Sequence, residues 1–274
     1  MKRILVPTDF SEYAENALKT AALIAKKNNS EIYLLHLLDL PNQMNDAITA
    51  GSSIPEVMLF IKKANEKLQK ITDQPYLDGL TIYTSVQFEK AFDGILTFNK
   101  KNEIDLIVMG SHGTSGMEEI LIGSNAEKVV RMSEVPVLVI KKDAKDLKFE
   151  NFVFASDFSE ETVIPFKKML EFTKAFNANL SLVTISTPNS FKNTLEAEQK
   201  MNEFVKNYEI ENYSLHLFND SNIENGIKNF SKKINADLIG ICTHGRTGLA
   251  HFFNGSISED LVNHISKPVI TFKI

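Results

Sequence analysis

The sequence predicts an α/β protein with two tandem open parallel sheets, and two observations lead to this fold class. Short apolar runs alternate with segments of helical periodicity, which is the pattern of βαβ units with right-handed crossovers. The pattern also occurs twice: ILVPTDFSE (4–12) aligns with FVFASDFSE (152–160), and DLIVMGSHGTSG (105–116) aligns with DLIGICTHGRTG (237–248). We therefore predict two Rossmann-like α/β domains related by pseudo-twofold symmetry.

The repeat sets the predicted domain boundaries. The copies align with an offset of 148 residues at their starts and 132 residues near their ends, so the second copy has a shorter middle. We predict a first domain over residues 1–142, a second over 150–274, and a charged linker over 141–150. The final apolar runs, 136–142 and 268–273, would otherwise leave open sheet edges, so we expect the domains to pair through them.

The first copy contains nine predicted elements. Ala14, Ala17, Leu18, Ala21 and Ala25 recur at helical spacing after the first apolar run, whereas a second apolar run ends before Pro41. The predicted strands are 3–8, 31–39, 80–88, 105–110 and 136–142, and the predicted helices are 14–25, 55–72, 93–102 and 124–133.

The second copy repeats this order. Pro165 falls inside its first helical segment, so we expect that helix to start late or to kink. The predicted strands are 151–156, 179–186, 211–218, 236–242 and 268–273, and the helices end near 176 or span 190–207, 222–233 and 256–265.

Composition limits the functional classes. The chain has 274 residues, 43% of them hydrophobic and 24% charged, which indicates a globular protein. The net charge of -5 without a basic run argues against nucleic acid as a partner. The single cysteine, Cys242, excludes an intramolecular disulfide. Asp9 comes too early for a signal peptide and no apolar window is long enough to span a membrane, so we expect a soluble cytoplasmic protein with no membrane partner.

A glycine-studded loop follows the predicted strand 105–110 and precedes a helix. Gly110, Gly113 and Gly123 would let backbone N–H groups approach an anion, which would also meet the positive end of the helix dipole. The series Ser124 to Glu127 has the spacing of a capping box, as does Ser256 to Glu259. The alternative is that the glycines only form turns.

Thr8 and Asp9 follow the first strand. If this strand lies beside strand 105–110, the Asp9 carboxylate could accept hydrogen bonds from ribose hydroxyls near the glycine loop. The alternative is a residue that only starts a turn or a helix. The combination of strand ends, carboxylate and glycine loop indicates a nucleotide site.

These residues resemble the universal stress proteins of the ATP-binding type. The resemblance rests on Pro-Thr-Asp-Phe-Ser after the first strand, on His36, and on Gly-x2-Gly-x9-Gly-Ser, and it covers both copies. It implies HUP-type domains that bind an adenine nucleotide, ATP or AMP, together with Mg²⁺. In such a site Asp9 would contact the ribose and the Leu37 backbone would contact adenine. It further implies a phosphate site at Gly110, Gly113, Gly123, Ser124 and Asn125.

The matching positions in the second copy are Asp157, Ile185, Gly245, Gly255, Ser256 and Ile257. Cys242 stands where the first copy has Gly110, and its Cβ would crowd a phosphate or strain a positive φ. Arg246 opposes this effect because it adds a cation where the first copy has Thr114. We expect tighter nucleotide binding in the first copy.

Other candidate reactive residues have simpler explanations. His112 and His244 recur at matched positions without a partner at metal or triad spacing, so we favour loop packing over catalysis for both. Cys242 is better explained as a small buried apolar residue than as a reactive thiol.

Three functional hypotheses follow. The first is a regulatory adenine-nucleotide-binding protein of the stress response, with a protein partner that the sequence does not identify and with a homodimer allowed. The second is an enzyme that adenylylates a substrate or hydrolyses ATP. It lacks support from a Gly-x4-Gly-Lys-Ser/Thr loop and from any Lys or Arg in 110–125, so only slow hydrolysis is expected. The third, a scaffold without ligand, suits the second copy.

Overall fold

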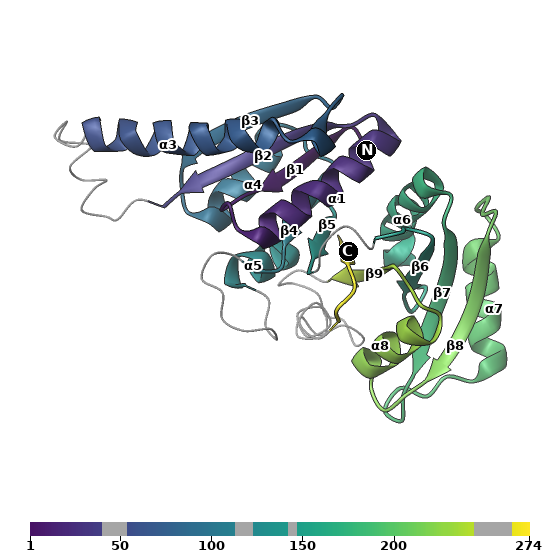
Figure 1. The fold of residues 1–274 in the computed structure, drawn as a ribbon. Helices are drawn as coiled ribbons and strands as arrows, with labels where there is room; N and C mark the ends of the chain where they lie inside the picture. The colour runs from purple at the N-terminus through teal and green to yellow at the C-terminus, as the bar shows by residue number, and fades with distance from the viewer. Residues whose placement is uncertain (40–53, 113–122, 142–146, 244–264) are drawn as a thin grey trace.

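A single ten-stranded sheet runs through the whole protein (Figure 1). The computed structural model describes residues 1–39, 54–112, 123–141, 147–243 and 265–274. The strand order is β3-β2-β1-β4-β5-β10-β9-β6-β7-β8. All neighbouring strands are parallel except β5 and β10, which are antiparallel. The predicted fold class, two open α/β units, is confirmed.

The first half has its predicted elements within a few residues. In chain order they are β1 (Arg3–Pro7), α1 (Glu12–Asn28), β2 (Glu31–Leu38), α3 (Ile54–Thr72), a 3-10 turn (Pro75–Leu77), β3 (Ile82–Phe88), α4 (Ala91–Lys101), β4 (Leu106–Gly110), α5 (Ser124–Met132) and β5 (Val137–Ile140).

The second half repeats this order, and its described elements agree with the prediction. They are β6 (Asn151–Ala155), a 3-10 turn (Glu160–Thr162), α6 (Val163–Phe176), β7 (Asn179–Ser186), α7 (Thr194–Val205), β8 (Tyr213–Asn219), α8 (Ile223–Lys233), β9 (Leu238–Thr243) and β10 (Val269–Lys273). The helix predicted at 256–265 lies almost wholly outside the described residues.

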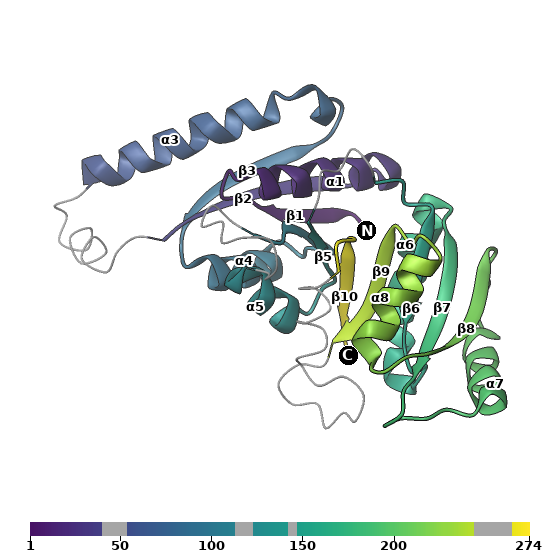
Figure 2. The ribbon, with the colours of Figure 1, turned by 60° about the horizontal axis from the view of Figure 1, so that its bottom comes forward.

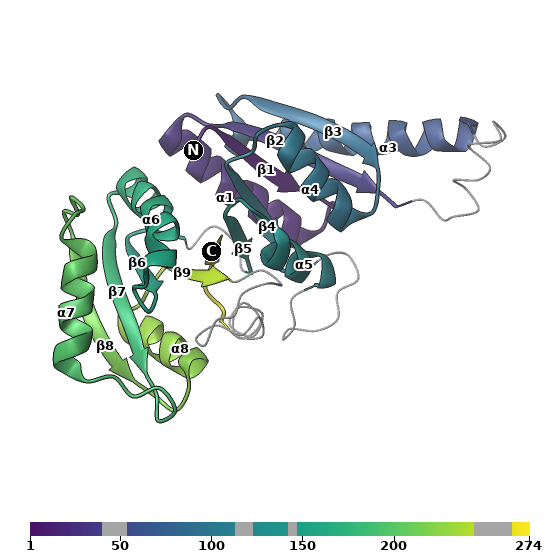
Figure 3. The same ribbon diagram turned by 180° about the vertical axis from the view of Figure 1, so that it is seen from behind.

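Two apolar cores cover the two faces of the sheet. One contains Leu18 of α1, Leu68 of α3, Phe166 of α6 and Met201 of α7, so these four helices share a face. The other core contains buried side chains of α4, α5 and α8. Figure 2 shows α1 and α3 on one side of the first-half strands, and Figure 3 shows α4 and α5 from behind. Parallel strands covered on both faces explain the continuous apolar runs in the sequence.

The two halves join at the centre of the sheet, as predicted. Val139 pairs with Val269 and Val137 with Thr271 across β5 and β10, and the Thr271 hydroxyl donates to the Val137 carbonyl oxygen at 3.3 Å. The antiparallel pair lies between two halves of the same strand order, which gives the pseudo-twofold relation. Both final strands are thereby protected as interior strands.

The halves differ mainly between their second and third strands. Residues 39–53 connect β2 to α3, whereas residues 187–193 connect β7 to α7. Helix α3 has 19 residues and α7 has 12. The shorter middle of the second copy is therefore confirmed. Within the described part of the chain, no helix combines the length and the apolar character needed to cross a membrane.

The first helices of the halves begin differently. The Ser11 hydroxyl caps α1 by accepting from the Ala14 N–H at 3.2 Å, so the helix starts at Glu12. In the second half a 3-10 turn occupies the matching residues and α6 begins only at Val163. Pro165 then lies in the first turn, where its missing N–H breaks no helical hydrogen bond. The late start expected from Pro165 is confirmed.

Candidate functional site

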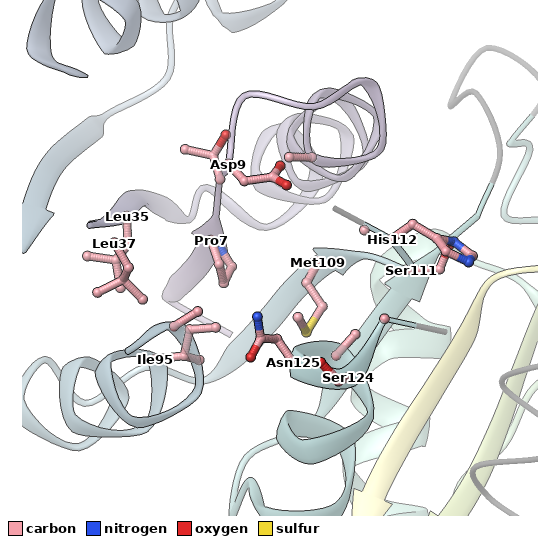
Figure 4. A pocket seen from close by; sticks show the side chains of 16 residues that line it. Pro7, Asp9, Leu35, Leu37, Ile95, Met109, Ser111, His112, Ser124 and Asn125 are labelled. Atoms are coloured by element: carbon pink, nitrogen blue, oxygen red, sulfur yellow. The ribbon is translucent and has the colours of Figure 1, made fainter. Parts of the chain in front are cut away.

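A pocket of about 290 Å³ opens at the carboxyl ends of the strands in the first half (Figure 4). It lies between β1 and β4, where the chain connections leave to opposite faces, which is the usual ligand position in open α/β sheets. This volume is close to the lower limit of small-molecule pockets, which is about 300 Å³. The lining residues are Pro7, Thr8, Asp9, Ala14, Leu35, Leu37, Ala91, Ile95, Met109, Gly110, Ser111, His112, Gly123, Ser124, Asn125 and Ala126.

One wall of the pocket is the turn from β1 into α1. The Thr8 hydroxyl accepts from the Phe10 N–H at 3.1 Å, and the Asp9 carboxylate accepts from the Ser11 N–H at 3.0 Å. Phe10 adopts a left-handed conformation with φ of 67°. These local hydrogen bonds hold a conformation that a large side chain disfavours. They place the Asp9 carboxylate at the pocket.

His36 of β2 contacts this turn through a hydrogen bond and a ring contact. Its Nδ1 lies 2.7 Å from the Thr8 carbonyl oxygen, and because a carbonyl can only accept, Nδ1 carries the proton. The imidazole ring also stacks on Phe10, with 4.3 Å between ring centroids. Burial lowers the pKa of His36, and the nearby Lys67 charge adds to this effect. The ring is therefore neutral at pH 7, with a defined tautomer.

The end of the pocket near β2 is apolar. Leu37 of β2 and Ile95 of α4 both line this end (Figure 4). Gly94 of α4 makes room for Leu37, since a Cβ on Gly94 would come within 2.5 Å of Leu37 Cδ2. Ala91 adds a second small residue to the same helix face. A flat apolar ring could fit between these side chains.

The opposite wall consists of the end of β4 and the start of α5. The Ser111 N–H donates to the Ile140 carbonyl oxygen, and the Gly123 N–H donates to the Ser111 carbonyl oxygen at 2.7 Å. Gly123 is the N-cap of α5, and as a glycine it has no side chain that could cap the helix. The predicted capping box at Ser124 is therefore wrong, because Ser124 is already the first helical residue. The helix start, with its orphan N–H groups, borders the pocket.

The structure gives a packing reason for glycine at position 110 that the sequence did not indicate. The φ of Gly110 is not positive, since Gly79 is the one described glycine with a positive φ. A Cβ on Gly110 would instead lie 2.8 Å from the carbonyl carbon and oxygen of Tyr13 in α1. Glycine is needed here because α1 packs directly on the β4 backbone. The expected strain at Cys242 from a positive φ thus has no counterpart at Gly110.

The structure brings together most of the first-half residues singled out in the sequence. Thr8, Asp9, Leu37, Gly110, Gly123, Ser124 and Asn125 all line the pocket. Gly113, Gly245, Gly255, Ser256 and Ile257 lie outside the described residues. Sequence reasoning missed the contributions of α4 and of Met109 to the lining. The sequence does contain a signal for α4. When the copies are aligned at the 132-residue offset, Ala91 of the first copy aligns with the larger Ile223 of the second.

Among the described residues, the pocket at the matching strand ends of the second half is small. Its volume is about 20 Å³, which is room for a single water molecule. Asp157 and Ile185 line it, as do Lys192 and Ile223. Lys192 comes from the short 187–193 connection, and its N–H donates to the Ser186 hydroxyl at 3.1 Å. In the described part of the second half, Lys192 and Ile223 thus border a much smaller space than the pocket of the first half.

The explanations favoured for Cys242 and His112 agree with the structure. Cys242 is fully buried in the core, and burial raises the pKa of its thiol, so the sulfur stays protonated. His112 Nδ1 lies 2.9 Å from the Ser111 hydroxyl, and its ring stacks on Tyr13 at 5.1 Å. His244 lies outside the described residues. The described residues contain no group of three His, Cys, Asp or Glu that could hold a metal ion.

We expect the protein to lose stability in mildly acidic solution because of two histidines. Burial lowers the pKa of both His36 and His216 in the folded state. The unfolded chain then binds more protons, so the free energy of unfolding should fall as the pH drops from about 7 to about 5. Denaturant titrations across this range measure the slope. In the double variant His36→Thr, His216→Gln the free energy of unfolding should depend less on pH. An unchanged dependence would contradict the role given to these two histidines.

The fold defines a tandem α/β protein with a pocket at the switch point of its first half. The chain belongs to the universal stress protein family, whose model matches residues 1–141 and again 148–273. A universal stress protein of Methanocaldococcus jannaschii is 34% identical over 146 residues, covering 53% of this chain and 85% of the relative.

Two further relatives extend over the whole tandem arrangement. A universal stress protein of Synechocystis is 22% identical over 296 residues and covers 100% of both chains. The crystal structure of a universal stress protein from Archaeoglobus fulgidus has a TM-score of 0.77 at 23% sequence identity, covering 99% of this chain and 98% of the other. The tandem fold is therefore shared with another member of the family.

Proposed function

We propose that the first half binds an adenine nucleotide, ATP or AMP, and that the protein acts as a nucleotide-dependent regulator in the stress response. The observation that carries the proposal is the arrangement of the pocket. Asp9 and the start of α5 lie on opposite sides of it, with the apolar residues Leu37 and Ile95 at one end (Figure 4). A nucleoside needs an apolar site for its base and a carboxylate for its ribose, and a phosphate needs free N–H groups.

Each part of the nucleotide has a complementary part of the pocket. The base would lie against Leu37 and Ile95, and the Asp9 carboxylate would accept hydrogen bonds from the ribose hydroxyls. The phosphates would approach the N–H groups at the start of α5, where the N-cap residue Gly123 has no side chain to compete for them. The described lining residues include no Lys or Arg, so Mg²⁺ arriving with the nucleotide would supply the missing positive charge.

The same charge balance disfavours the second function, rapid phosphoryl transfer or adenylylation. Such reactions rely on Lys or Arg side chains at the transferred group in addition to Mg²⁺, and the described lining contains neither residue type. Slow ATP hydrolysis remains compatible with the pocket. We propose that the second half serves mainly as a structural partner of the first, because its matching pocket has only about 20 Å³ of space among the described residues.

The ligand can be identified without prior assumption. The purified protein should be denatured and the released small molecules analysed by mass spectrometry, followed by calorimetric titration of ligand-free protein with ATP and AMP. We expect an adenylate to be released and to rebind. Release of a different class of molecule, together with no heat from either adenylate, would refute the proposed function.

Gly123→Val should weaken nucleotide binding about tenfold, since a branched side chain would stand where phosphate approaches the helix start. The φ of Gly123 is -61°, which valine can adopt, so the fold should survive. Calorimetric titration measures the affinity, and thermal unfolding checks the fold. Gly123→Ala is the matched control and should have a smaller effect. An unchanged affinity in folded Gly123→Val would remove the phosphate from this site.

A further inference from the structure

We propose that His36 is a positioning residue of the nucleotide site: by holding the Thr8 carbonyl it sets the turn that aims Asp9 into the pocket. This inference rests on the proposed function and deepens it. His36 is not among the residues that line the pocket. It acts instead through the peptide that links Thr8 to Asp9, to which its Nδ1–H donates at 2.7 Å.

The second half contains the same hydrogen bond with a different donor. The Thr184 hydroxyl donates to the Ser156 carbonyl oxygen at 2.8 Å. His36 and Thr184 both occupy the sixth position of their eight-residue strands, β2 and β7. Ser156 matches Thr8 just after the first strand of its half. Two chemically unlike side chains thus hold the same carbonyl, which indicates that the fold requires the hydrogen bond rather than a particular side chain.

The bond lies where the regular sheet pairing of β1 ends. The Thr8 N–H still donates to the Leu35 carbonyl oxygen at 2.8 Å, which continues the parallel ladder from Pro7. In such a ladder the next bond would join the Thr8 carbonyl to a backbone N–H of β2. The His36 side chain provides the donor instead. The chain can therefore leave the sheet at Asp9 while the Thr8 carbonyl keeps a partner.

The residues after Asp9 make this support necessary. Phe10 has a φ of 67° and Phe158, its counterpart, has a φ of 54°, a region that large side chains disfavour. The His36 ring stacks on the Phe10 ring, and the Lys67 ammonium lies 4.8 Å from the centroid of Phe10. The turn is thus held by the His36 hydrogen bond on one side of Asp9 and by ring contacts on the other. Loss of the hydrogen bond would free the Thr8 peptide to rotate and would move the Asp9 carboxylate.

The chain itself supplies a matched pair of variants. His36→Thr introduces the hydroxyl donor that the second half uses. His36→Val introduces a side chain of nearly the same shape as threonine but without a hydrogen-bond donor. We expect His36→Thr to bind the adenine nucleotide within about threefold of the wild type and His36→Val to bind about tenfold more weakly. Thr184→Val, which removes the equivalent bond in the second half, should leave first-half affinity unchanged. Calorimetric titration measures the affinities, and thermal unfolding confirms that each variant folds.

A second measurement tests the positioning without nucleotide. Amide hydrogen exchange at Phe10 and Ser11, whose N–H groups are bonded within the turn, should be faster in His36→Val than in His36→Thr. Equal exchange rates, or equal nucleotide affinities of the two variants, would overturn the role of His36. If the wild type itself bound neither ATP nor AMP while the exchange rates differed as expected, the proposed function would fail and His36 would still position Asp9.

Discussion

Asp9→Ala should weaken adenine-nucleotide binding by at least about 30-fold, which corresponds to about 2 kcal/mol. The carboxylate stands at the pocket in a turn built around it, and hydrogen bonds from ribose hydroxyls to a charged group are among the stronger ones in proteins. The variant should still fold, because the aspartate is partly exposed and contributes one N–H bond to the turn.

The repeat provides the control for this prediction. Asp157 makes the same turn contact as Asp9, with its carboxylate accepting from the Ser159 N–H at 3.1 Å. Its pocket, however, has about 20 Å³ of space against about 290 Å³ in the first half. Asp157→Ala should therefore leave affinity unchanged, and the wild type should bind one nucleotide per chain. Calorimetry yields affinity and stoichiometry together.

Opposite results would locate the site differently. If Asp157→Ala weakened binding as much as Asp9→Ala did, or if the wild type bound two nucleotides with equal affinity, the small second pocket would have to open in solution. Lys192→Ala removes one of the side chains that border it. A gain of a second nucleotide in that variant would show that Lys192 closes the pocket.

Gly110→Ala and Gly110→Cys should both destabilise the protein by about 2–3 kcal/mol, with nearly equal effects. The conflict arises at Cβ, which both variants add, 2.8 Å from the Tyr13 carbonyl group of α1. Because these are backbone atoms of a helix, the clash can be relieved only by moving α1 away from β4. Denaturant unfolding measures the loss of stability. Nucleotide affinity should fall as well, because the turn that contains Asp9 leads directly into α1.

Gly79→Ala is the contrasting control. Gly79 has a φ of 79° and no atom within 4 Å of an added Cβ, so alanine should cost only the about 1 kcal/mol of a left-handed conformation. If Gly110→Ala were as stable as the wild type, close packing of α1 on β4 would not be the reason for glycine. A smaller cost for Gly110→Ala than for Gly110→Cys would indicate that atoms beyond Cβ cause the clash.

The comparison of the two halves explains why Cys242 is tolerated. The counterpart of Tyr13 is Glu161, which lies in a 3-10 turn instead of the first turn of an α-helix. The side chain of Cys242 is buried in the core of the second half. A glycine in one half and a cysteine in the other therefore accompany two different helix starts. The alignment of the two copies shows the Gly110–Cys242 and Tyr13–Glu161 differences, but it does not show that these positions lie close together in the first half.

The order of elements, the repeat and the ends of the strands that carry the pocket follow from the sequence alone. Apolar periodicity and proline placement act over a few residues, so Ala17 and Pro165 can be interpreted locally, whereas the capping box predicted from Ser124 is wrong. The repeat adds long-range information, because two copies of one pattern predict two similar units. The position of Asp9 beside the glycine loop followed from the strand order expected of such units.

The tertiary structure alone decided which residues share the pocket space and why. The contact of Gly110 with Tyr13, the position of Lys192 and Ile223 at the second pocket, and the hydrogen bond from His36 to Thr8 each join residues distant in the chain. Such contacts depend on the packing of helices onto the sheet to within a few tenths of an ångström, and residue spacing carries no information on that scale. The nearly identical turns at Asp9 and Asp157 thus border an open pocket in one half and, among the described residues, a much smaller one in the other.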